Sequence, residues 1–248
     1  MELTQSKPAP SRGWLVCQFI AGDLRELRTK ASRVVTRQQV PYVPPAEWGV
    51  PDSQASQKAL ELVTQVSPTF LLDHCLRTHA FAVAMGHKVR QKIDREVLFL
   101  GCVMHDLGLT PDHDHGDTFE LDGARAARSH CLQHGLSAER ADLVHEMVAL
   151  HNSVGVAHER EPEVALTHFG AGADVLGLGV HDIHRRTLQE ILAEYPRVGF
   201  GEGMARLIGD QMQRKPQSFM TSMVALGFLD RLRKTRLPGE SESIAPSR

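Results

Sequence analysis

The sequence has no strong excess of charge of either sign. Its 28 lysines and arginines oppose 30 aspartates and glutamates, which leaves a formal charge of −2. Proteins that neutralise many phosphates need a basic surplus, so nucleic acid is not an expected partner. Long apolar runs are missing too. The longest apolar stretch near the start, Trp14 to Ala21, is interrupted by Gln18 and is far too short to span a membrane. Without a convincing signal-peptide core, the chain is expected to be soluble and cytoplasmic, with no membrane partner.

Closely spaced cysteine pairs are also absent. The four cysteines, Cys17, Cys75, Cys102 and Cys131, form no CxxC motif, and three of them fall in apolar helical patterns. This spacing favours free, buried thiols in a reducing compartment. No internal repeat is visible, and no alternating apolar pattern supports a sizeable sheet, so the sequence predicts an all-α protein with a substantial core.

Helical periodicity begins near residue 53. Asp52 or Ser53, Asp94 and Ser137 are suited to cap helices, while Asp117 and Glu120 have the spacing of a capping box. Helix ends are expected at Gly108 and Gly135. The predicted helices cover 53–66, 69–92, 94–108, 117–134, 137–151, 162–174, 182–194, 202–213 and 217–235.

These patterns divide the chain into three parts. Residues 1–52 are an N-terminal extension with a proline-rich linker at 41–51, in which 1–12 are a loose tail and 14–40 form short strands or a helix. Residues 53–236 are the helical domain. Residues 237–248 are expected to be a disordered tail.

Histidine is confined to one part of the chain. All fourteen histidines lie between His74 and His184, which directs attention there for metal or acid–base chemistry. Three His-Asp dipeptides occur where composition alone predicts about one, so the dipeptide by itself is a weak signal. His105-Asp106 differs from the others because it ends an apolar helical run just before Gly108.

Further ligand-type residues lie on other predicted helices. His74 and Arg77 are three residues apart and share a helix face. Asp174 lies among small and apolar residues, where a carboxylate is costly to bury unless it is paired or bound to metal. Together with His105 and Asp106, His74 and Asp174 provide two imidazoles and two carboxylates. Such a set suits a divalent cation of the zinc, iron or manganese type and leaves positions for water and substrate.

The order of these motifs resembles the HD-domain superfamily of metal-dependent hydrolases over about residues 53–180. The matching pieces are His74-Cys75-Leu76-Arg77, His105-Asp106-Leu107-Gly108 and Asp174. A narrower similarity, to the branch that includes the cyanamide hydratases, rests on four further segments: Ser67-Pro68…Leu71-Leu72-Asp73-His74, Phe119-Glu120-Leu121-Asp122-Gly123-Ala124, Ala149-Leu150-His151-Asn152-Ser153 and the run Pro162 to Gly177.

The resemblance implies an HD-type helical bundle, with extensions at both ends, that binds one divalent metal. Its ligands would be His74, His105, Asp106 and Asp174, with zinc favoured and iron or manganese as alternatives. Two-metal relatives place histidines near positions 120 and 150. Here Glu120 departs from that pattern while His151 fits it, so a single metal is favoured and a second stays open.

The resemblance and the chemistry of these side chains together suggest catalytic roles. Asp106 could accept a proton from metal-activated water, Glu120 or His151 could deliver protons, and Arg77 could hold an anionic group. Each residue also has a structural interpretation. His74 and His151 could be hydrogen-bonded core histidines, Asp106 a helix-end residue and Glu120 the capping-box partner of Asp117. The loop histidines, His113 and His115, could be solvated or form a lid.

Three functions therefore compete. The first is hydration or hydrolysis of a small molecule, in the manner of a cyanamide hydratase that converts a nitrile. The second is hydrolysis of a phosphomonoester or phosphodiester, which a thin supply of cations near the motifs slightly disfavours. The third is a non-catalytic ligand-binding module, which the intact ligand set argues against. The expected partner is a small-molecule substrate, and a homo-oligomeric assembly stays open.

Overall fold

The computed structural model describes residues 39–240. Our expectations for residues 1–12, for 14–38, for Cys17 and for residues 241–248 lie outside the described residues. The first residues of the predicted C-terminal tail do fall inside them. There Leu237 is buried and Glu240 accepts a hydrogen bond from Arg197, so this part of the chain packs on the domain.

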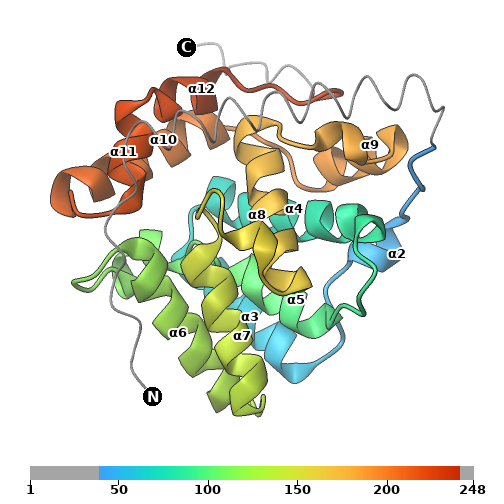
Figure 1. The fold of residues 1–248 in the computed structure, drawn as a ribbon, viewed down its shortest axis with the longest axis horizontal. Helices are drawn as coiled ribbons and strands as arrows, with labels where there is room; N and C mark the ends of the chain where they lie inside the picture. Colours follow the sequence, from blue (N-terminus) through green and yellow to red (C-terminus); the bar gives the residue numbers. More distant parts are fainter. Residues whose placement is uncertain (1–38, 241–248) are drawn as a thin grey trace.

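Every regular element among the described residues is helical, which confirms the all-α prediction (Figure 1). None of these helices combines the length and apolarity that a membrane crossing needs. Short 3-10 turns lie between several of them. In chain order the helices are α2 (Pro45–Trp48), α3 (Gln54–Val66), α4 (Thr69–Met85), α5 (Arg95–Met104), α6 (Phe119–Gln133), α7 (Ala138–Leu150), α8 (Pro162–Leu176), α9 (Arg185–Glu194), α10 (Phe200–Arg214), α11 (Phe219–Ala225) and α12 (Phe228–Lys234).

Three helix starts follow from side chains that cap free backbone N–H groups. Ser53 accepts a hydrogen bond from the backbone of Ser56, and Asp94 accepts one from Val97. Ser137 does the same at the start of α7. These contacts satisfy donors that the first turn of a helix leaves unpaired, and they confirm the caps expected from the sequence.

The capping box at Asp117 and Glu120 was a wrong prediction. Thr118 is the N-cap of α6 and makes no side-chain cap bond. Asp122, from inside the helix, accepts the backbone N–H groups of both Asp117 and His115 at 3.2 and 3.1 Å. Because Asp122 takes this role, Glu120 is directed into the interior instead, where it is 5% exposed.

Three predicted helix lengths also need correction. The helix expected over 69–92 ends at Met85 and is followed by a short 3-10 turn. The helix expected to reach Gly108 ends at Met104, so His105 and Asp106 lie beyond its last turn. The helix expected over 217–235 is two helices, because Gly227 adopts φ +86° between them, a left-handed conformation that stops a helix.

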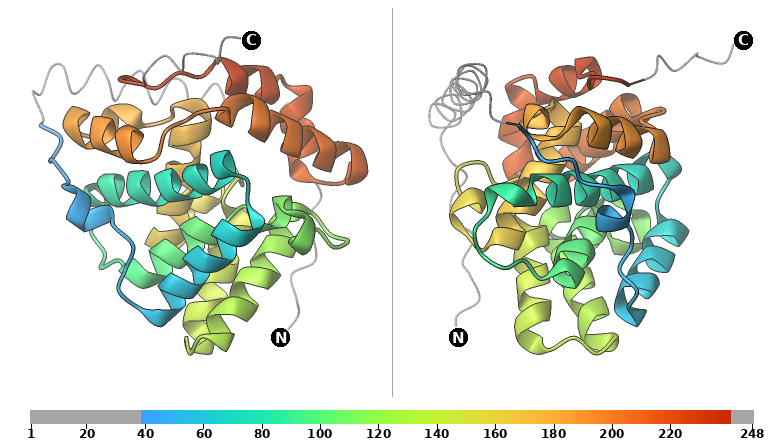
Figure 2. Two further views of the ribbon diagram at one scale, coloured as in Figure 1. Left: turned by 180° about the vertical axis from the view of Figure 1, so that it is seen from behind. Right: turned by 90° about the vertical axis from the view of Figure 1, so that its right-hand side faces the viewer.

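The helices form a bundle in which α5 is central. Helix α5 packs against α3, α4, α7 and α8, while α6 and α7 form an adjacent pair. Helices α10 and α12 lie on the other side of α4 and α8 and form an upper layer (Figures 1 and 2). The contact between α4 and α8 depends on Gly170, where an added Cβ would lie 2.3 Å from the carbonyl oxygen of Thr78. This close approach brings the middle of α4 next to α8.

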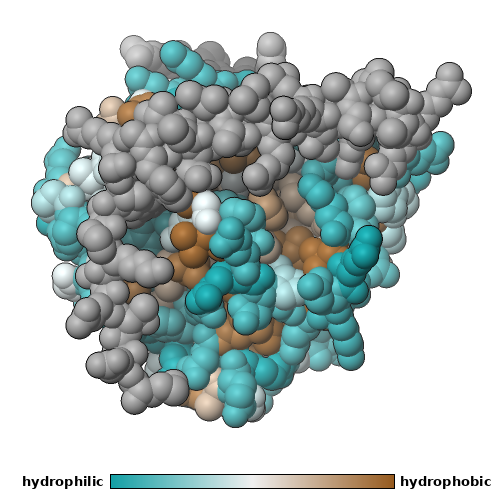
Figure 3. Space-filling model, viewed as in Figure 1, coloured by the Kyte–Doolittle hydropathy of each residue, from teal (hydrophilic) through white to brown (hydrophobic). Residues whose placement is uncertain are grey.

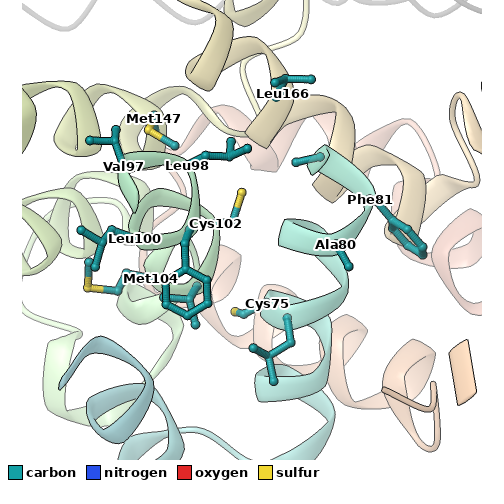
Figure 4. Packing of buried hydrophobic residues seen from close by; sticks show 14 of the residues in the cluster. Cys75, Ala80, Phe81, Val97, Leu98, Leu100, Cys102, Met104, Met147 and Leu166 are labelled. Carbon is teal, nitrogen blue, oxygen red and sulfur yellow. The ribbon is translucent and has the colours of Figure 1, made fainter. Parts of the chain in front are cut away.

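Two clusters of buried apolar side chains stabilise this arrangement. The main core surrounds α5, where Leu98, Leu100, Cys102 and Met104 meet residues of α4, α7 and α8 such as Met147 (Figure 4). The three described cysteines are free and buried, as predicted, and burial raises the pKa of Cys102 to about 12. The second cluster joins α10, α11 and α12 to α4, α6 and the 3-10 turn at Leu107–Leu109. It contains Leu71, Leu109, Phe119, Phe200, Met204, Ala205, Ile208, Met212, Met220, Met223 and Leu232.

Part of the apolar material reaches the surface. On the face drawn in Figure 3, apolar residues lie between hydrophilic side chains near the middle of the molecule. Phe169 on α8 and Val156 in the loop before it are examples of exposed apolar side chains, at 42% and 43%. Single exposed apolar residues are common on soluble proteins, so we base no functional argument on them.

Candidate metal centre and adjoining cavity

Three side chains from consecutive helical segments converge at one buried point. His74 lies in the middle of α4, whereas His105 and Asp106 follow the last turn of α5. The Nε2 atoms of the two histidines are 3.1 Å apart, and Asp106 Oδ2 lies 3.4 Å from the first and 3.2 Å from the second. All three residues are at most 4% exposed. The structure therefore brings together three of the four predicted ligands as a group that could hold a metal ion.

The hydrogen bonds of the two Nδ1 atoms determine whether each Nε2 atom carries a lone pair. His105 Nδ1 donates to the carbonyl oxygen of Cys102 at 2.7 Å, and His74 Nδ1 donates to Asp174 Oδ2 at 2.7 Å. Neither oxygen can donate, so each Nδ1 carries a proton, and each ring in its neutral form has its lone pair on Nε2. Two lone pairs and a carboxylate directed at one point repel one another unless a cation lies between them. The residues present thus fit a divalent metal.

The charges of the cluster agree with this interpretation. Burial alone would raise the pKa of Asp106, but its electrostatic and hydrogen-bonding interactions with His105, together with its hydrogen bond to His74, hold that pKa well below its usual range. Burial also opposes protonation of His74, yet the hydrogen bonds and charges of Asp106 and Asp174 outweigh it and raise the pKa of His74. The site is therefore built to keep positive charge, which a metal ion can provide in place of a proton.

Asp174, the fourth predicted ligand, lies behind His74. Its Oδ2 accepts from His74 Nδ1 and from Arg77 at 2.8 Å, while its Oδ1 accepts from Arg77 at 2.9 Å and from Arg197 at 3.0 Å. Burial would raise the pKa of this carboxyl, but the charge of Arg77 and the hydrogen bond from His74 lower it strongly. In this arrangement Asp174 orients the ring of His74, in the way that carboxylates commonly support metal-binding histidines. Its role as a direct ligand stays a prediction.

Arg77, predicted to hold an anionic group, is buried and does not line the cavity described below. It is fully buried, and besides Asp174 its guanidinium donates to the carbonyl oxygens of Tyr195 and Pro196 at 3.0 and 2.9 Å. Four of its N–H groups are committed to these acceptors. The arrangement supports a role for Arg77 in holding Asp174 and gives no support to the predicted role in binding an anionic group.

Phe200, the first residue of α10, closes the back of the site. Its ring stacks on the ring of His74 with centroids 4.9 Å apart and an interplanar angle of 26°. The guanidinium carbons of Arg77 and Arg197 lie 5.1 and 5.0 Å from the centroid of the same ring. This aromatic surface separates the Arg–Asp network from solvent, which strengthens its electrostatic interactions.

His151 lies beside the three-residue group, at the end of α7. Its Nδ1 donates to the carbonyl oxygen of Val148 at 2.7 Å, so its Nε2 also has a lone pair, 3.6 Å from Asp106 Oδ1. Burial, with the nearby charge of His105, lowers the pKa of His151 to about 4. His151 is therefore a neutral imidazole at pH 7, directed at Asp106.

Glu120 supports this side of the site from α6. Asn152 donates to its Oε1 at 2.6 Å, whereas Oε2 is buried without a hydrogen-bond partner. Burial raises the pKa of Glu120, and the charge of Asp106 adds to the effect. Asn152 lines the cavity described below and Glu120 does not, so Glu120 reaches the cavity through Asn152. The role of Glu120 as a proton donor stays a prediction.

A cavity of about 290 Å³ opens beside the metal-ligand group. His74, His105, Asp106, His151 and Asn152 form the polar part beside the metal-ligand group, and further polar lining residues are Lys88, His158, His168, His181, Asp182 and Arg231. The rest of its wall is largely apolar and includes Phe119, Val154, Phe169, Val175, Met204, Ile208, Met220, Met223 and Phe228. The loop histidines His113 and His115 are not among its lining residues. An apolar cavity with convergent polar groups at one end is the usual form of a small-molecule site.

Comparison with known proteins agrees with the motifs and the fold. Residues 71–177 match the family model of the HD domain. This segment is an HD domain. Two relatives, "Cyanamide hydratase DDI2" and "Cyanamide hydratase DDI3" of Saccharomyces cerevisiae (strain ATCC 204508 / S288c), are each 23% identical to the chain over 181 residues. Each alignment covers 70% of this chain and 79% of the relative. These matches agree with the predicted resemblance to the HD-domain superfamily.

Several residues that build the site were missed by the sequence analysis because they lie outside the HD domain. Arg197 lies between α9 and α10, Phe200 is the first residue of α10, and no local motif marks either. Met204 and Ile208 are four residues apart on α10, so their helical spacing indicated a buried face. It gave no sign that this face borders a cavity.

Proposed function

We propose that this protein is a metal-dependent hydratase that adds water to a small uncharged molecule, with a nitrile as the reacting group. The observation that carries the proposal is the convergence of the lone pairs of His74 and His105 with Asp106 at the end of an apolar cavity. The names of the two yeast relatives support a cyanamide-type reaction. Each is only 23% identical to this chain, so the particular substrate is part of the proposal.

His74, His105 and Asp106 would hold the metal ion, and zinc is the best match to two imidazoles and one carboxylate, with iron or manganese as alternatives. Asp174 would orient His74 from behind. When bound, the metal supplies a water of lowered pKa and polarises the group under attack. The second metal that histidine-rich relatives bind is not needed for this chemistry.

His151 is the residue best placed to move a proton. It is uncharged at pH 7, its Nε2 lies 3.6 Å from Asp106 and it lines the cavity. In nitrile hydration a proton leaves the attacking water and one reaches the nitrogen. Asp106 and His151 are adjacent groups that could accept the first and return the second. Asn152, held by Glu120, adds a polar group to the same wall.

The phosphohydrolase alternative is less favoured by the charges of the cavity. A phosphate group needs cations around its oxygens. Arg77 is committed to Asp174 and does not line the cavity. Lys88 and Arg231 do line it, and Lys88 forms an ion pair with Asp182. A neutral substrate matches this lining better than a phosphoester.

The test is a parallel assay on protein purified without chelator. We expect about one divalent metal ion per chain, release of urea from cyanamide and no phosphate from aryl phosphomonoesters or phosphodiesters. Replacing His151→Gln should lower the hydration rate by about 10²- to 10⁴-fold, the usual contribution of a positioned general base, with metal content unchanged. The matched control is His113→Gln, because His113 does not line the cavity. Phosphate release without hydration of any nitrile would reject the proposal, and metal binding with neither activity would favour a ligand-binding module.

A further inference from the structure

The cavity beside the metal-ligand group is far larger than cyanamide. An apolar cavity of about 150 Å³ is enough to hold a benzene molecule, whereas one water occupies about 30 Å³ of the liquid. At about 290 Å³, the cavity has room for roughly a dozen non-hydrogen atoms on the same scale. Cyanamide would fill only its polar end.

One part of the remaining wall, lined by methionine side chains, offers no polar partners to water. Met204, Met220 and Met223 line it, and they are at most 3% exposed. Buried water needs two to four polar partners, which thioether and aromatic side chains do not provide. Methionine side chains are unbranched and polarisable, so they adapt to ligands of irregular shape and pack well against aromatic rings. This part of the wall is suited to an apolar group.

We propose that the substrate is an aromatic or bulky aliphatic nitrile whose apolar group occupies the methionine-lined part of the cavity and whose nitrile carbon lies at the His105–Asp106 end. This inference rests on the proposed function and specifies its substrate class. The reaction needs no redox partner. The oxygen of water bonds to the nitrile carbon while one π bond between carbon and nitrogen opens. One O–H bond of the water breaks, an equivalent proton is delivered to the nitrogen, and the imidic acid tautomerises to the amide.

The methionine-lined part of the wall lies outside the segment that matches the HD family model. The metal-ligand group belongs to the HD domain at 71–177. Met204, Met220 and Met223 lie on α10 and α11, beyond that segment. The metal-ligand group and the three methionines of the wall therefore come from different parts of the chain.

The first experiment compares substrates on the metal-loaded full chain. Each buried methylene-sized group contributes roughly a fourfold factor in binding. We therefore expect kcat/KM for benzonitrile to exceed that for cyanamide by at least about 100-fold. A value for cyanamide equal to or above that for benzonitrile would overturn the inference and leave metal-dependent hydration standing.

A second experiment measures binding without turnover. Benzamide, the product of benzonitrile hydration, is titrated into protein with ¹³C-labelled methionine methyl groups. The methyl signals of Met204, Met220 and Met223 should shift, whereas that of Met147, in the main core and outside the cavity lining, should not. If benzamide shifts the three signals but no nitrile is hydrated, the apolar site stands and the nitrile chemistry fails. Without shifts of these signals, the inference fails whatever the activity.

Variants of α10 test the wall directly. Met204→Gln places a polar amide of similar length in the wall, and we expect it to weaken benzamide binding by on the order of tenfold, with metal content unchanged. Met204→Leu keeps the wall apolar and should restore binding, which separates polarity from loss of folding. The matched control is Met212→Gln, on the same helix and equally part of the second cluster but not a lining residue. Equal effects of the two glutamine variants would overturn the inference.

Discussion

The two apolar clusters differ in what they pack around. The main core encloses α5 with residues such as Phe99, Leu100 and Met147, all with no exposed surface, and it holds His105 at the end of that helix. The second cluster, rich in methionine, borders the 290 Å³ cavity through Met204 and Met223. Close packing fixes side chains to within small displacements, whereas a methionine wall beside a cavity can rearrange. One region would therefore position the proposed metal ligands, and the other would accommodate the proposed substrate.

The largest effect, on metal content and activity, is expected from replacing His105, which the main core holds at the end of α5. Replacing His105→Ala removes one of three converging donors, so we expect the bound metal to fall from about one ion per chain to less than a tenth, and activity to be lost. Elemental analysis of purified protein measures this. His113→Ala, in the loop after α5, is the control and should retain its metal. Full metal content in His105→Ala would contradict the proposed ligand set.

Matched methionine truncations compare the two regions with the same chemical change. Met147→Ala, in the main core, should lower the free energy of unfolding by about 4 kcal/mol, because its neighbours cannot collapse into the space. Met223→Ala, which only enlarges an existing cavity, should cost about 2 kcal/mol. Urea denaturation measures both. Equal losses would remove the distinction between a dense core and an adaptable wall.

A third prediction concerns the ion pair between Asp174 and Arg197. Arg197, which comes from outside the HD domain, donates to Oδ1 and to the backbone carbonyl oxygen of Asp174. We expect Arg197→Gln to loosen the orientation of His74 and to weaken metal affinity by about 10- to 100-fold. Chelator competition measures the affinity, and the d–d spectrum of the cobalt form reports the ligand geometry.

Arg233→Gln is the control for this variant, because Arg233 forms its ion pairs at the surface. Unchanged or tighter metal binding in Arg197→Gln would indicate that Asp174, once released, is itself a ligand. That result would restore the direct role predicted from the motif.

The smallest expected effect is a pH dependence of the free energy of unfolding, caused by the buried side chain of His79. Burial, with the charge of Arg95, lowers the pKa of His79 to about 4 from 6.5. The unfolded chain therefore binds more protons than the folded one between these values. The contribution of His79 to stability is complete above pH 6.5 and declines as the pH falls toward 4, by about 2 kcal/mol at pH 5.

Unfolding free energies at pH 7.5 and pH 5 measure this contribution. His79→Gln should show a smaller loss on acidification than the unsubstituted protein, since glutamine does not titrate. His134→Gln, at a partly exposed position on the end of α6, serves as the control. An identical loss with and without His79 would show that water reaches this part of the core.

Much of the fold followed from local patterns. The positions of α3, α5 and α7 were predictable because Ser53, Asp94 and Ser137 act on neighbouring backbone groups. The capping box does not form at Asp117 because Asp122 accepts the backbone N–H of Asp117 instead. The helix predicted over 217–235 is divided in two because Gly227 adopts a left-handed conformation. Local rules fail where two nearby side chains can satisfy the same backbone group.

The candidate site was predictable to the extent that its residues belong to a motif. His74, His105 and Asp106 were identified as ligand-type residues and lie together. The role of Arg77 was not predictable in this way, because its partners are the carboxylate of Asp174 and the carbonyl oxygens of a segment more than a hundred residues away. Arg197 has no motif at all.

The sequence by itself determined that the chain is helical, that its histidines are concentrated in one stretch, and that an HD motif orders four ligand-type residues. These properties depend on periodicity, capping and residue type, which act over a few residues or are read directly from composition. Only the tertiary structure decided which nitrogen of each histidine carries a lone pair, where Asp174 directs its charge, and how large the cavity is. Those properties depend on the carbonyl oxygens, guanidinium groups and methionine side chains that distant helices bring to the site, and no local pattern encodes such contacts.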